Sequence, residues 1–425
     1  MPPVSNRSQT ACRVGLNAHL LSLTQTYRGA GINGYIYQLL RHLPAADGGF
    51  AYAAYLHDPR FEPPAGLMVR RSRWDTRSPW RRIVWEQTRL AVESRGLALL
   101  HGLAYATPLA AACPTVVTVH DLSFLRFPEA FRPFNRYYLG FITRLSTRRA
   151  VRVIAVSEST RQDVIALCGV PPARVVTVPN GVTGEFCPAG PVEVAAFRRR
   201  KGLPERFILY LGTLEPRKNL ACLVEAYGLW RRREYGSMGE REYGSVGVRE
   251  HPHPHTPTPL HAHQRGPEGV KLIIAGAKGW YYEQIFARVR ELGLDDDVIF
   301  PGFVQADELP FWYRAAELFV YPSLFEGFGL PVLEALACAA PVITSAASAL
   351  PEVAGDAALL VNSEDTAALA TAIGRVMGAP ALRAELATAG PRQAARFSWS
   401  RTAAETAAVY RAALGAPSPD RRKLS

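Results

Sequence analysis

Cysteine is scarce in this chain, and long hydrophobic runs are missing from it. The six cysteines of the 425 residues are scattered, and no two of them form a CxxC pair. Such spacing argues against a zinc site or a disulfide framework and favours reduced thiols in a cytosolic protein. No apolar run reaches the ~18 residues that a membrane-spanning helix needs. The opening residues, MPPVSNRSQTACRV, lack the apolar core of a signal peptide. We therefore expect a cytoplasmic protein.

Lysine is absent from residues 1–190, although this half carries 22 arginines against 11 acidic residues. Its net charge of +11 makes up nearly all of the +12 of the whole chain. This asymmetry favours an anionic partner (a lipid surface, a phosphorylated acceptor or nucleic acid), and an arginine-rich solvated face is the alternative. RNA-binding motifs with interleaved aromatic residues are absent from the sequence, which disfavours nucleic acid. Seven arginines fall within residues 70–89. We expect peripheral contact with the inner face of the membrane through a few of six of them: Arg70, Arg71, Arg73, Arg77, Arg81 and Arg82.

Strand-like and helix-like patterns alternate through most of the chain. Such alternation predicts right-handed crossovers and parallel sheets. We expect an α/β protein with two doubly wound domains, one over residues 1–190 and one over 191–395. The candidate strands are CRVGLNAH, FAYAAYLH, TVVTVHD, RVIAVSES and RVVTVPN in the first half, and RFILYLGT, VKLIIAGA, DVIFPGFV, ELFVYPS and APVITSA in the second.

Residues 231–268 interrupt this alternation. The motif REYGS occurs twice there, followed by a run rich in proline and histidine that holds five of the ten histidines of the chain. A segment of this composition cannot bury a core, so we expect a disordered insertion between a helix and the strand at Lys271. The histidines lack an accompanying frame of carboxylates or thiols, and we expect no metal site.

The stretch LFEGFGLPVLEALACA places two glutamates, Glu326 and Glu334, eight residues apart. It follows an apolar run that is typical of a buried strand. Pro331 suits the first turn of a helix, which would put Glu334 in that turn and leave Glu326 in a loop bent by Gly327 and Gly329. The amides of the helix start can bind phosphate, and the two carboxylates can accept hydrogen bonds from sugar hydroxyls. Two solvated acids near a helix end are the alternative.

Two further stretches put polar side chains directly after a predicted strand. FILYLGTLEPRKNL places Arg217 and Lys218 before a helix, where paired cations suit a pyrophosphate whose charge grows as it leaves. A pair exposed on the surface is the alternative. TVVTVHDLSF places His120 and Asp121 at the carboxyl end of a strand, the edge at which ligands bind in open α/β sheets. The imidazole could hydrogen-bond a sugar hydroxyl or shield a developing positive charge, or it could simply pack against its own loop.

The stretch RGAGINGYIYQLL satisfies the dinucleotide-binding pattern GxGxxG with Gly29, Gly31 and Gly34. Asp58 ends the next candidate strand, near where an acid that binds ribose would lie. The glycines begin about ten residues after the first strand, however, whereas the fingerprint requires an immediate turn. An NAD-dependent oxidoreductase using GAGING is therefore the alternative function, and a glycine loop facing an interdomain cleft explains the pattern equally well.

Taken together, these stretches resemble the retaining family 4 (group 1) glycosyltransferases of the GT-B fold. The resemblance covers nearly the whole chain apart from the insertion and the last few residues. It implies two Rossmann-like domains that face a cleft, and a crossover helix and tail over residues 396–425, in which FSWSRTAAETAAVYRAAL returns to the first domain. The set of motifs is specific in its order: AGINGY, VHD, VPNGV, GTLEPRKN, FEGFGLPVLE and ALPEVAGDAALLV.

The resemblance also implies a binding site for a nucleoside diphosphate sugar. Arg217 and Lys218 would bind the pyrophosphate of this donor, and Glu334 would bind its ribose hydroxyls. Many family members carry an arginine after the glycine that matches Gly212, where this chain has Thr213. Phosphate binding would thus rest more heavily on Arg217 and Lys218. The other expected donor-binding residues are Gly31, whose loop would approach the phosphate or the acceptor, and the amides near Phe328, Gly329 and Leu330.

The catalytic group implied by the resemblance consists of His120, Glu326 and Lys218. Glu326 would contact the donor sugar, and His120 would touch it from the other side of the cleft. The anomeric configuration would be retained by a front-face route, because no carboxylate can be named as a nucleophile. The family generally works without a bound metal, and we expect no cofactor. GTLEPRKN is similar to mannosyltransferase-like members, which favours GDP-mannose as the donor and a cell-envelope, polysaccharide or lipid-linked glycan as the acceptor.

Overall fold

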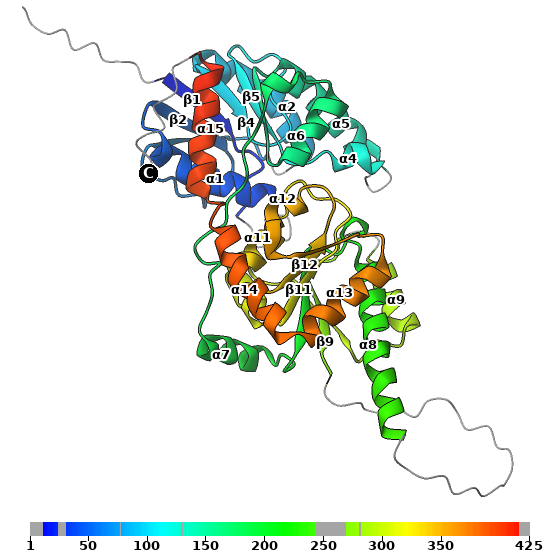
Figure 1. The fold of residues 1–425 in the computed structure, drawn as a ribbon. Coiled ribbons are helices and arrows are strands. Elements are labelled where there is room, and N and C mark those ends of the chain that lie inside the picture. Colours follow the sequence, from blue (N-terminus) through cyan, green and yellow to red (C-terminus); the bar gives the residue numbers. More distant parts are fainter. Residues whose placement is uncertain are drawn as a thin grey trace, which may run out of the picture.

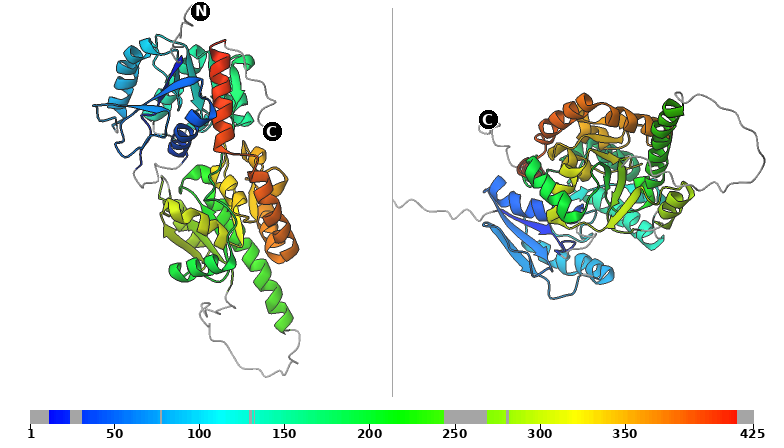
Figure 2. Two further views of the ribbon diagram at one scale, coloured as in Figure 1. Left: turned by 90° about the vertical axis from the view of Figure 1, so that its left-hand side faces the viewer. Right: turned by 90° about the horizontal axis from the view of Figure 1, so that it is seen from below.

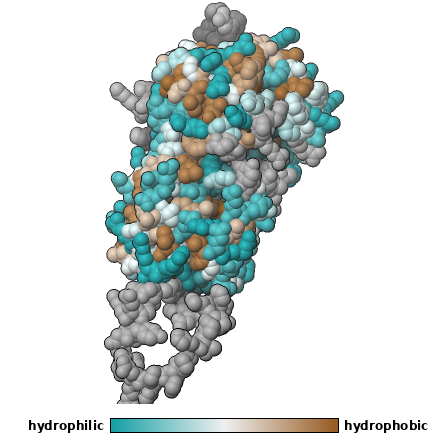
Figure 3. All heavy atoms as spheres, turned by 90° about the vertical axis from the view of Figure 1, so that its right-hand side faces the viewer, coloured by the Kyte–Doolittle hydropathy of each residue, from teal (hydrophilic) through white to brown (hydrophobic). Residues whose placement is uncertain are grey.

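The computed structural model describes residues 12–23, 31–76, 78–128, 131, 133–243, 269–279 and 282–415. These residues form two α/β domains that lie one above the other, each built on one parallel sheet (Figure 1). No helix in the described ranges is long and apolar enough to cross a membrane. On the face shown in Figure 3, hydrophobic groups are separated by hydrophilic residues in both domains.

The first domain holds seven parallel strands in the order β3-β2-β1-β4-β5-β6-β7. Successive side chains of a strand point to opposite faces of the sheet. In β4, Leu99 accordingly packs with helices α1 and α15, and its neighbour Leu100 packs with α2 and α3 on the other face. The strands are β1 (Cys12–Asn17), β2 (Phe50–Leu56), β3 (Leu67–Arg71), β4 (Leu99–Gly102), β5 (Thr115–Val119), β6 (Arg152–Ala155) and β7 (Val175–Thr177). The helices are α1 (Ile32–Ala46), α2 (Pro79–Gln87), α3 (Arg89–Glu93), α4 (Ser123–Arg126), α5 (Pro133–Arg149), α6 (Glu158–Cys168) and α15 (Trp399–Ala413).

The second domain holds six parallel strands in the order β10-β9-β8-β11-β12-β13. Every residue of the central strands β8 and β11 is buried, as expected for a parallel sheet covered by helices on both faces. The strands are β8 (Phe207–Leu211), β9 (Lys271–Ala275), β10 (Val298–Gly302), β11 (Leu318–Tyr321), β12 (Val342–Ser345) and β13 (Leu359–Val361). The helices are α7 (Pro191–Lys201), α8 (Leu220–Tyr243), α9 (Glu283–Glu291), α10 (Leu309–Ala315), α11 (Leu330–Ala337), α12 (Leu350–Ala354), α13 (Thr366–Gly378) and α14 (Pro380–Ala394).

Helix α15 returns to the first domain after the second is complete (Figures 1 and 2). Its buried residues Trp399, Ala403 and Tyr410 join the core formed by α1 and the neighbouring strands. The two connections between the domains run side by side, because Val182 and Ser398 form a parallel β-bridge. The predicted fold class, two doubly wound domains with a helix that crosses back, is confirmed.

The sequence patterns do not predict three of the strands. β3 and β13 lie at sheet edges, and β3 ends in exposed arginines, so neither shows the continuous apolar run of a buried strand. β4 is buried, but its second half is His101 and Gly102, which interrupt the apolar pattern. The positions of these three strands follow from pairing with their neighbours in the sheet more than from local sequence.

The first part of the segment expected to be disordered is helical. Helix α8 continues to Tyr243, so residues 231–243 belong to it rather than to an unstructured insertion. Once a helix is nucleated by a buried first half, each further residue adds a hydrogen bond at little cost, and arginine and glutamate favour extension despite the two glycines. The remaining residues of that expected segment, 244–268, lie outside the described residues, and so does Gly29 of the glycine motif.

Candidate active site

The candidate site lies where the carboxyl ends of β8 and β11 meet, since these strands are neighbours in the sheet. The turn after β8 ends in a 3₁₀ helix, Pro216–Lys218, and Asn219 then adopts a left-handed conformation before α8 begins. The side-chain amide of Asn219 donates to the carbonyl of Ser363 over 2.6 Å, which stabilises this turn. The turn therefore holds Arg217 and Lys218 at the edge of the sheet that faces the first domain.

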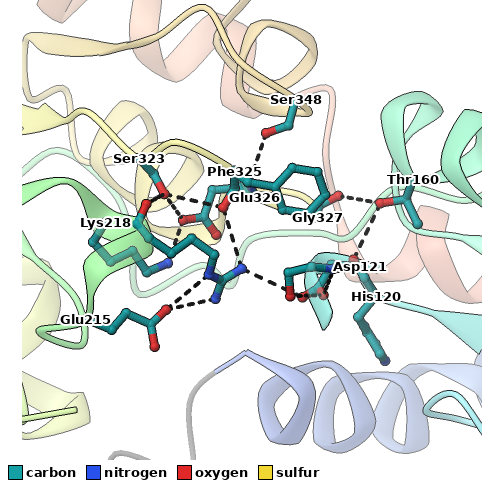
Figure 4. Close-up of polar contacts among 12 residues, drawn as sticks. His120, Asp121, Thr160, Glu215, Lys218, Ser323, Phe325, Glu326, Gly327 and Ser348 are labelled. Atoms are coloured by element: carbon teal, nitrogen blue, oxygen red, sulfur yellow. Dashed lines mark hydrogen bonds and ion pairs between the residues drawn. The ribbon is translucent and has the colours of Figure 1, made fainter. Parts of the chain in front are cut away.

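Lys218 and Glu326 form a buried ion pair, 2.5 Å between Nζ and Oε1 (Figure 4). The same carboxylate oxygen accepts hydrogen bonds from the hydroxyls of Tyr321 (3.0 Å) and Ser323 (2.6 Å). Lys218 also donates to the Tyr321 hydroxyl over 2.8 Å. Burial alone would raise the pKa of Glu326, but the charges of Lys218 and Arg217 and the hydrogen bonds outweigh burial and lower the pKa. Glu326 is therefore held as a carboxylate, and the structure brings it together with the predicted Lys218.

Arg217 lies between the two domains with acidic groups on both sides. Its Nη2 is 2.9 Å from Glu215 of its own turn, and its Nη1 is 3.9 Å from Asp121 of the first domain. Burial would lower the pKa of this guanidinium, but Glu326, Asp121 and Glu215 together raise it. Arg217 is thus a fixed cation at the domain boundary. Sequence reasoning did not single out Glu215, whose place two residues before Arg217 was the available signal.

His120 lies at the end of β5, in the first domain, and is buried. Its Nε2 donates to the carbonyl of Leu103 over 2.9 Å, which fixes the tautomer and leaves Nδ1 as an acceptor. Its ring packs edge-on against Tyr35 of α1 and Tyr105, with centroids 4.7 and 5.7 Å apart. Burial lowers the pKa of His120 to about 4, so the imidazole is neutral. In Figure 4 the ring is directed away from the Lys218–Glu326 pair, toward α1.

The two domains touch beside this site. A Cβ on Gly327 would lie 1.7 Å from the carbonyl oxygen of His120, so only glycine permits the approach. The carbonyl of Gly327 accepts hydrogen bonds from the hydroxyls of Ser157 (2.7 Å) and Thr160 (3.1 Å) at the start of α6. Glu352 of the second domain accepts from the first two amides of α6, each over 2.7 Å. Sequence reasoning missed these contacts, because their partners are 167 to 194 residues apart in the chain.

Glu334 lies on α11, on the same side of the domain as the loop of Glu326. Helix α11 begins at Leu330, so Pro331 is its second residue and Glu334 lies in the second turn rather than in the first, as expected from the sequence. The helix starts one residue earlier because Gly329, at a φ of 104°, takes the capping position. The hydroxyl of Tyr313 donates to Oε2 of Glu334 over 2.9 Å. Burial raises the pKa of Glu334 to about 7. The hydrogen bond from Tyr313 lowers this pKa, and the charge of Glu185 raises it, both less than burial does.

The other predicted donor-binding residues lie after strand β8 or at the starts of helices α1 and α11. Gly31 caps α1 at a φ of 65°, and its carbonyl accepts from the amide of Tyr35, which packs on His120. Thr213 follows β8 and accepts a hydrogen bond from Tyr210 through its carbonyl, 3.2 Å away. Phe328 is buried. Leu330 packs against the cores of both domains.

The dinucleotide reading of the first domain is not supported. The Asp58 carboxylate accepts from the amide of Leu23 over 2.7 Å and forms an ion pair with Arg60, over 2.5 Å. It therefore holds the loop after β1 in place. As for metals, the described residues contain no group of three or more histidine, cysteine or acidic side chains that could hold an ion.

Two facing Rossmann-like domains, with two cations and a carboxylate at their boundary, are the arrangement of the GT-B class of glycosyltransferases. Family models match both halves: "Glycosyltransferase Family 4" over residues 15–186 and "Glycosyl transferases group 1" over residues 258–378. The O-antigen chain mannosyltransferase B of Escherichia coli is 32% identical over 299 residues, which cover 70% of each chain. The chain belongs to the family 4, group 1 glycosyltransferases.

Other relatives are similar over part of their length. The serotype-specific mannosyltransferase WbdA of Escherichia coli is 30% identical over 68% of this chain, which spans about a third (32%) of that protein. Among solved structures, the sucrose-phosphate synthase of Thermosynechococcus elongatus has a TM-score of 0.70 at 21% identity, covering 95% of this chain and 99% of that one. WaaG, a glycosyltransferase involved in lipopolysaccharide biosynthesis, has a TM-score of 0.66 at 15% identity, covering 93% and 99%. At these identities the two structures show the shared fold.

Proposed function

We propose that this glycosyltransferase transfers mannose from GDP-mannose to a growing cell-envelope polysaccharide, with retention of the anomeric configuration and without a metal. The observation that carries the proposal is the pair Arg217 and Lys218, held beside Glu326 at the cleft. The half-buried cation of Arg217, the buried cation of Lys218 and a fixed carboxylate suit a donor that has an anionic pyrophosphate next to a sugar. Mannose and the polysaccharide acceptor are supported by the names of the relatives above, which are mannosyltransferases, one of them of the O-antigen chain.

In the proposed reaction, the bond between the anomeric carbon and the phosphate oxygen breaks, and its electron pair goes to the phosphate. The acceptor oxygen forms its bond to the same face of that carbon, and its proton passes to the leaving phosphate oxygen. Arg217 and Lys218 stabilise the negative charge that grows on the phosphate. Glu326 orients the sugar through its hydroxyls, and the neutral His120 accepts a hydroxyl hydrogen bond through Nδ1.

A panel of nucleotide sugars tests this function. The purified chain is incubated with GDP-mannose, UDP-glucose, UDP-galactose and UDP-N-acetylglucosamine, with and without EDTA. We expect donor hydrolysis or transfer with GDP-mannose, unchanged by the chelator, and a transfer product whose one-bond C1–H1 coupling shows the anomeric configuration of the donor. Turnover of another donor alone would replace mannose in the proposal, an inverted product would refute retention, and loss of activity with EDTA would refute metal independence.

The arginine cluster suits a peripheral contact between the first domain and an anionic membrane. Arg70, Arg71, Arg73 and Arg81 are exposed, and Trp74 and Trp80 beside them are 49% and 61% exposed. Tryptophan favours the membrane interface, and each basic residue near an anionic surface contributes about 1 kcal/mol. We therefore include a lipid-linked acceptor at the inner face of the membrane in the proposal.

Vesicle sedimentation tests the membrane contact. The protein should sediment with vesicles containing phosphatidylserine at low salt and be released at high salt, because screening weakens the attraction within about 8–10 Å. Charge reversal in R71E/R81E should reduce binding severalfold and leave donor hydrolysis unchanged. The control R375E/R392E makes the same change of charge at exposed arginines of the second domain and should bind as the wild type does. Equal sedimentation of the two variants would refute the cluster as the anchor.

A further inference from the structure

Tyr313 provides the only hydrogen bond that Glu334 receives from a described side chain. Its hydroxyl donates to Oε2 over 2.9 Å, and the tyrosine itself is fully buried. Oε1 takes no hydrogen bond from any residue that the structure describes. Glu334 is half-buried, and Oε1 is not one of the side-chain atoms that are both buried and unpartnered, so solvent reaches it. One oxygen of the carboxylate is thus held by Tyr313, and the other remains accessible.

Three elements fix the position of this hydroxyl. Tyr313 lies on α10, and its ring packs edge-on against Phe319 of β11, with centroids 5.1 Å apart. On the other side it meets Phe186 of the connection between the domains, at 6.1 Å. A side chain enclosed in this way has no alternative rotamer into which it could withdraw, so the donor is preorganised before any ligand binds.

We propose that Tyr313 is a positioning residue for the donor: by holding Oε2 of Glu334, it presents Oε1 to the hydroxyls of the nucleotide ribose. This inference rests on the proposed function, in which Glu334 binds the ribose. It adds a residue on α10, outside the motif of the two glutamates, to the machinery of nucleotide binding. Tyr313 does not touch the donor itself and acts through Glu334.

The hydrogen bond has a second effect, on the charge of Glu334. Among the described residues, the titratable groups around the carboxylate are Tyr313 on α10, Cys338 directly after α11 and Glu185 in the connection between the domains. Of these, the Tyr313 hydroxyl lowers the pKa of Glu334, and Glu185 raises it. An ionised carboxylate is the better acceptor for ribose hydroxyls, so nucleotide affinity should fall as the pH falls through about 7.

The test compares binding of GDP and of inorganic pyrophosphate by the wild type, Y313F, E334Q and Y313F/E334Q. The control is Y227F, which removes the hydroxyl of another fully buried tyrosine of the same domain. That hydroxyl donates a hydrogen bond to the carbonyl of Val270 over 2.7 Å. We expect Y313F to weaken GDP about tenfold, the order of a hydrogen bond to a charged group. Pyrophosphate binding should be unchanged, Y227F should bind as the wild type does, and the pH at which GDP affinity falls should move upward in Y313F.

The outcomes separate this inference from the proposed function. If E334Q weakens GDP but Y313F and Y227F both bind as the wild type does, the role of Tyr313 is refuted while the ribose role of Glu334 stands. If E334Q itself binds GDP normally, the ribose role fails, and that of Tyr313 with it. Y313F/E334Q covers the case in which Y313F alone is unstable, because the amide removes the buried charge that would lose its donor. Binding by this double variant at the level of E334Q supports the inference, and clearly weaker binding overturns it.

Discussion

Glu326 and Glu334 are eight residues apart and both largely buried, yet their surroundings push their pKa values in opposite directions. Glu326 has a cation and two hydroxyls on one oxygen, and its pKa is lowered. Glu334 has one hydroxyl in contact and no cation among the residues that the structure describes, and its pKa is raised to about 7. Burial acts on both in the same sense, so the difference comes from the partners. A repeated residue type in one motif can therefore supply two different chemical groups.

The largest loss of activity is expected when Lys218, the cation of the Lys218–Glu326 ion pair, is replaced. K218M should lower kcat/KM for the donor by about 10³-fold, the order seen when a preorganised group that stabilises the transition state is deleted. Initial rates with a saturating acceptor measure the effect. The control K201M breaks the partly exposed Lys201–Glu308 pair and should keep full activity. A K218M enzyme within threefold of the wild type would show that this lysine does not act on the donor.

Removing the anion of the Lys218–Glu326 pair should lower the stability of the protein as well as its activity. E326Q leaves Lys218 buried without its counterion, which should lower the free energy of unfolding by about 3–5 kcal/mol at pH 7. Since the folded pKa of Glu326 lies below 4.5, its contribution is present above pH 4.5 and is lost as the pH falls through that folded pKa. Urea unfolding of both proteins at pH 7 and pH 4 should show the difference narrowing in acid. A constant difference would mean that Glu326 does not titrate in this way.

Glu334 should respond to pH with the opposite sign. Its folded pKa of about 7 exceeds the 4.5 of the free side chain. The folded protein therefore keeps a proton that the unfolded chain releases, and the contribution of Glu334 is lost as the pH rises from 4.5 to 7. The difference in free energy of unfolding between E334Q and the wild type should shift in favour of E334Q by on the order of 1–3 kcal/mol between pH 4.5 and pH 8. Urea unfolding at the two pH values measures this gain, and E364Q, an exposed glutamate on the same domain, is the control. An equal gain in E364Q would assign the effect to general charge.

The smallest effect is expected from one of the supporting hydroxyls. S323A removes one of the three donors to Glu326 but leaves Lys218 and Tyr321 in place. The expected cost is about 0.5–1.5 kcal/mol of stability with a modest loss of kcat. S94A removes a buried serine hydroxyl of the first domain and should cost similar stability with unchanged kcat. A full loss of activity in S323A would mean that the ion pair does not hold Glu326 in place alone.

The fold could be predicted from the sequence to the extent that each element carries its own signal. Buried strands such as TVVTV and FILYL are apolar runs with turn residues on either side, and all ten candidate strands exist. The strands that were not predicted, β3, β4 and β13, depend on pairing with their neighbours, which local sequence does not encode. The extension of α8 beyond residue 231 was likewise hidden, because composition describes the capacity to form a core and not the propagation of a helix.

The site could be predicted only where a motif holds several of its residues together. Lys218 and Glu326 lie in two such motifs, and the structure brings them into contact. The contacts of Tyr313, Glu215 and Glu352 depend on the packing of α10, on the turn after β8 and on the meeting of the two domains. None of these three changes the local pattern of the sequence, since a tyrosine inside a helix or a glutamate in a turn is unremarkable until its partner is known.

The meeting of Gly327 with the carbonyl of His120 sets the width of the gap between the domains. A single methyl group at position 327 would act as a wedge: with 1.7 Å available, the chain could admit it only by spreading the domains or by moving the loop that carries Glu326. In a G327A protein, the two domains would then be separated by a larger distance at the contact between position 327 and His120. The close approach of the two domains at this point therefore depends on position 327 having no Cβ atom.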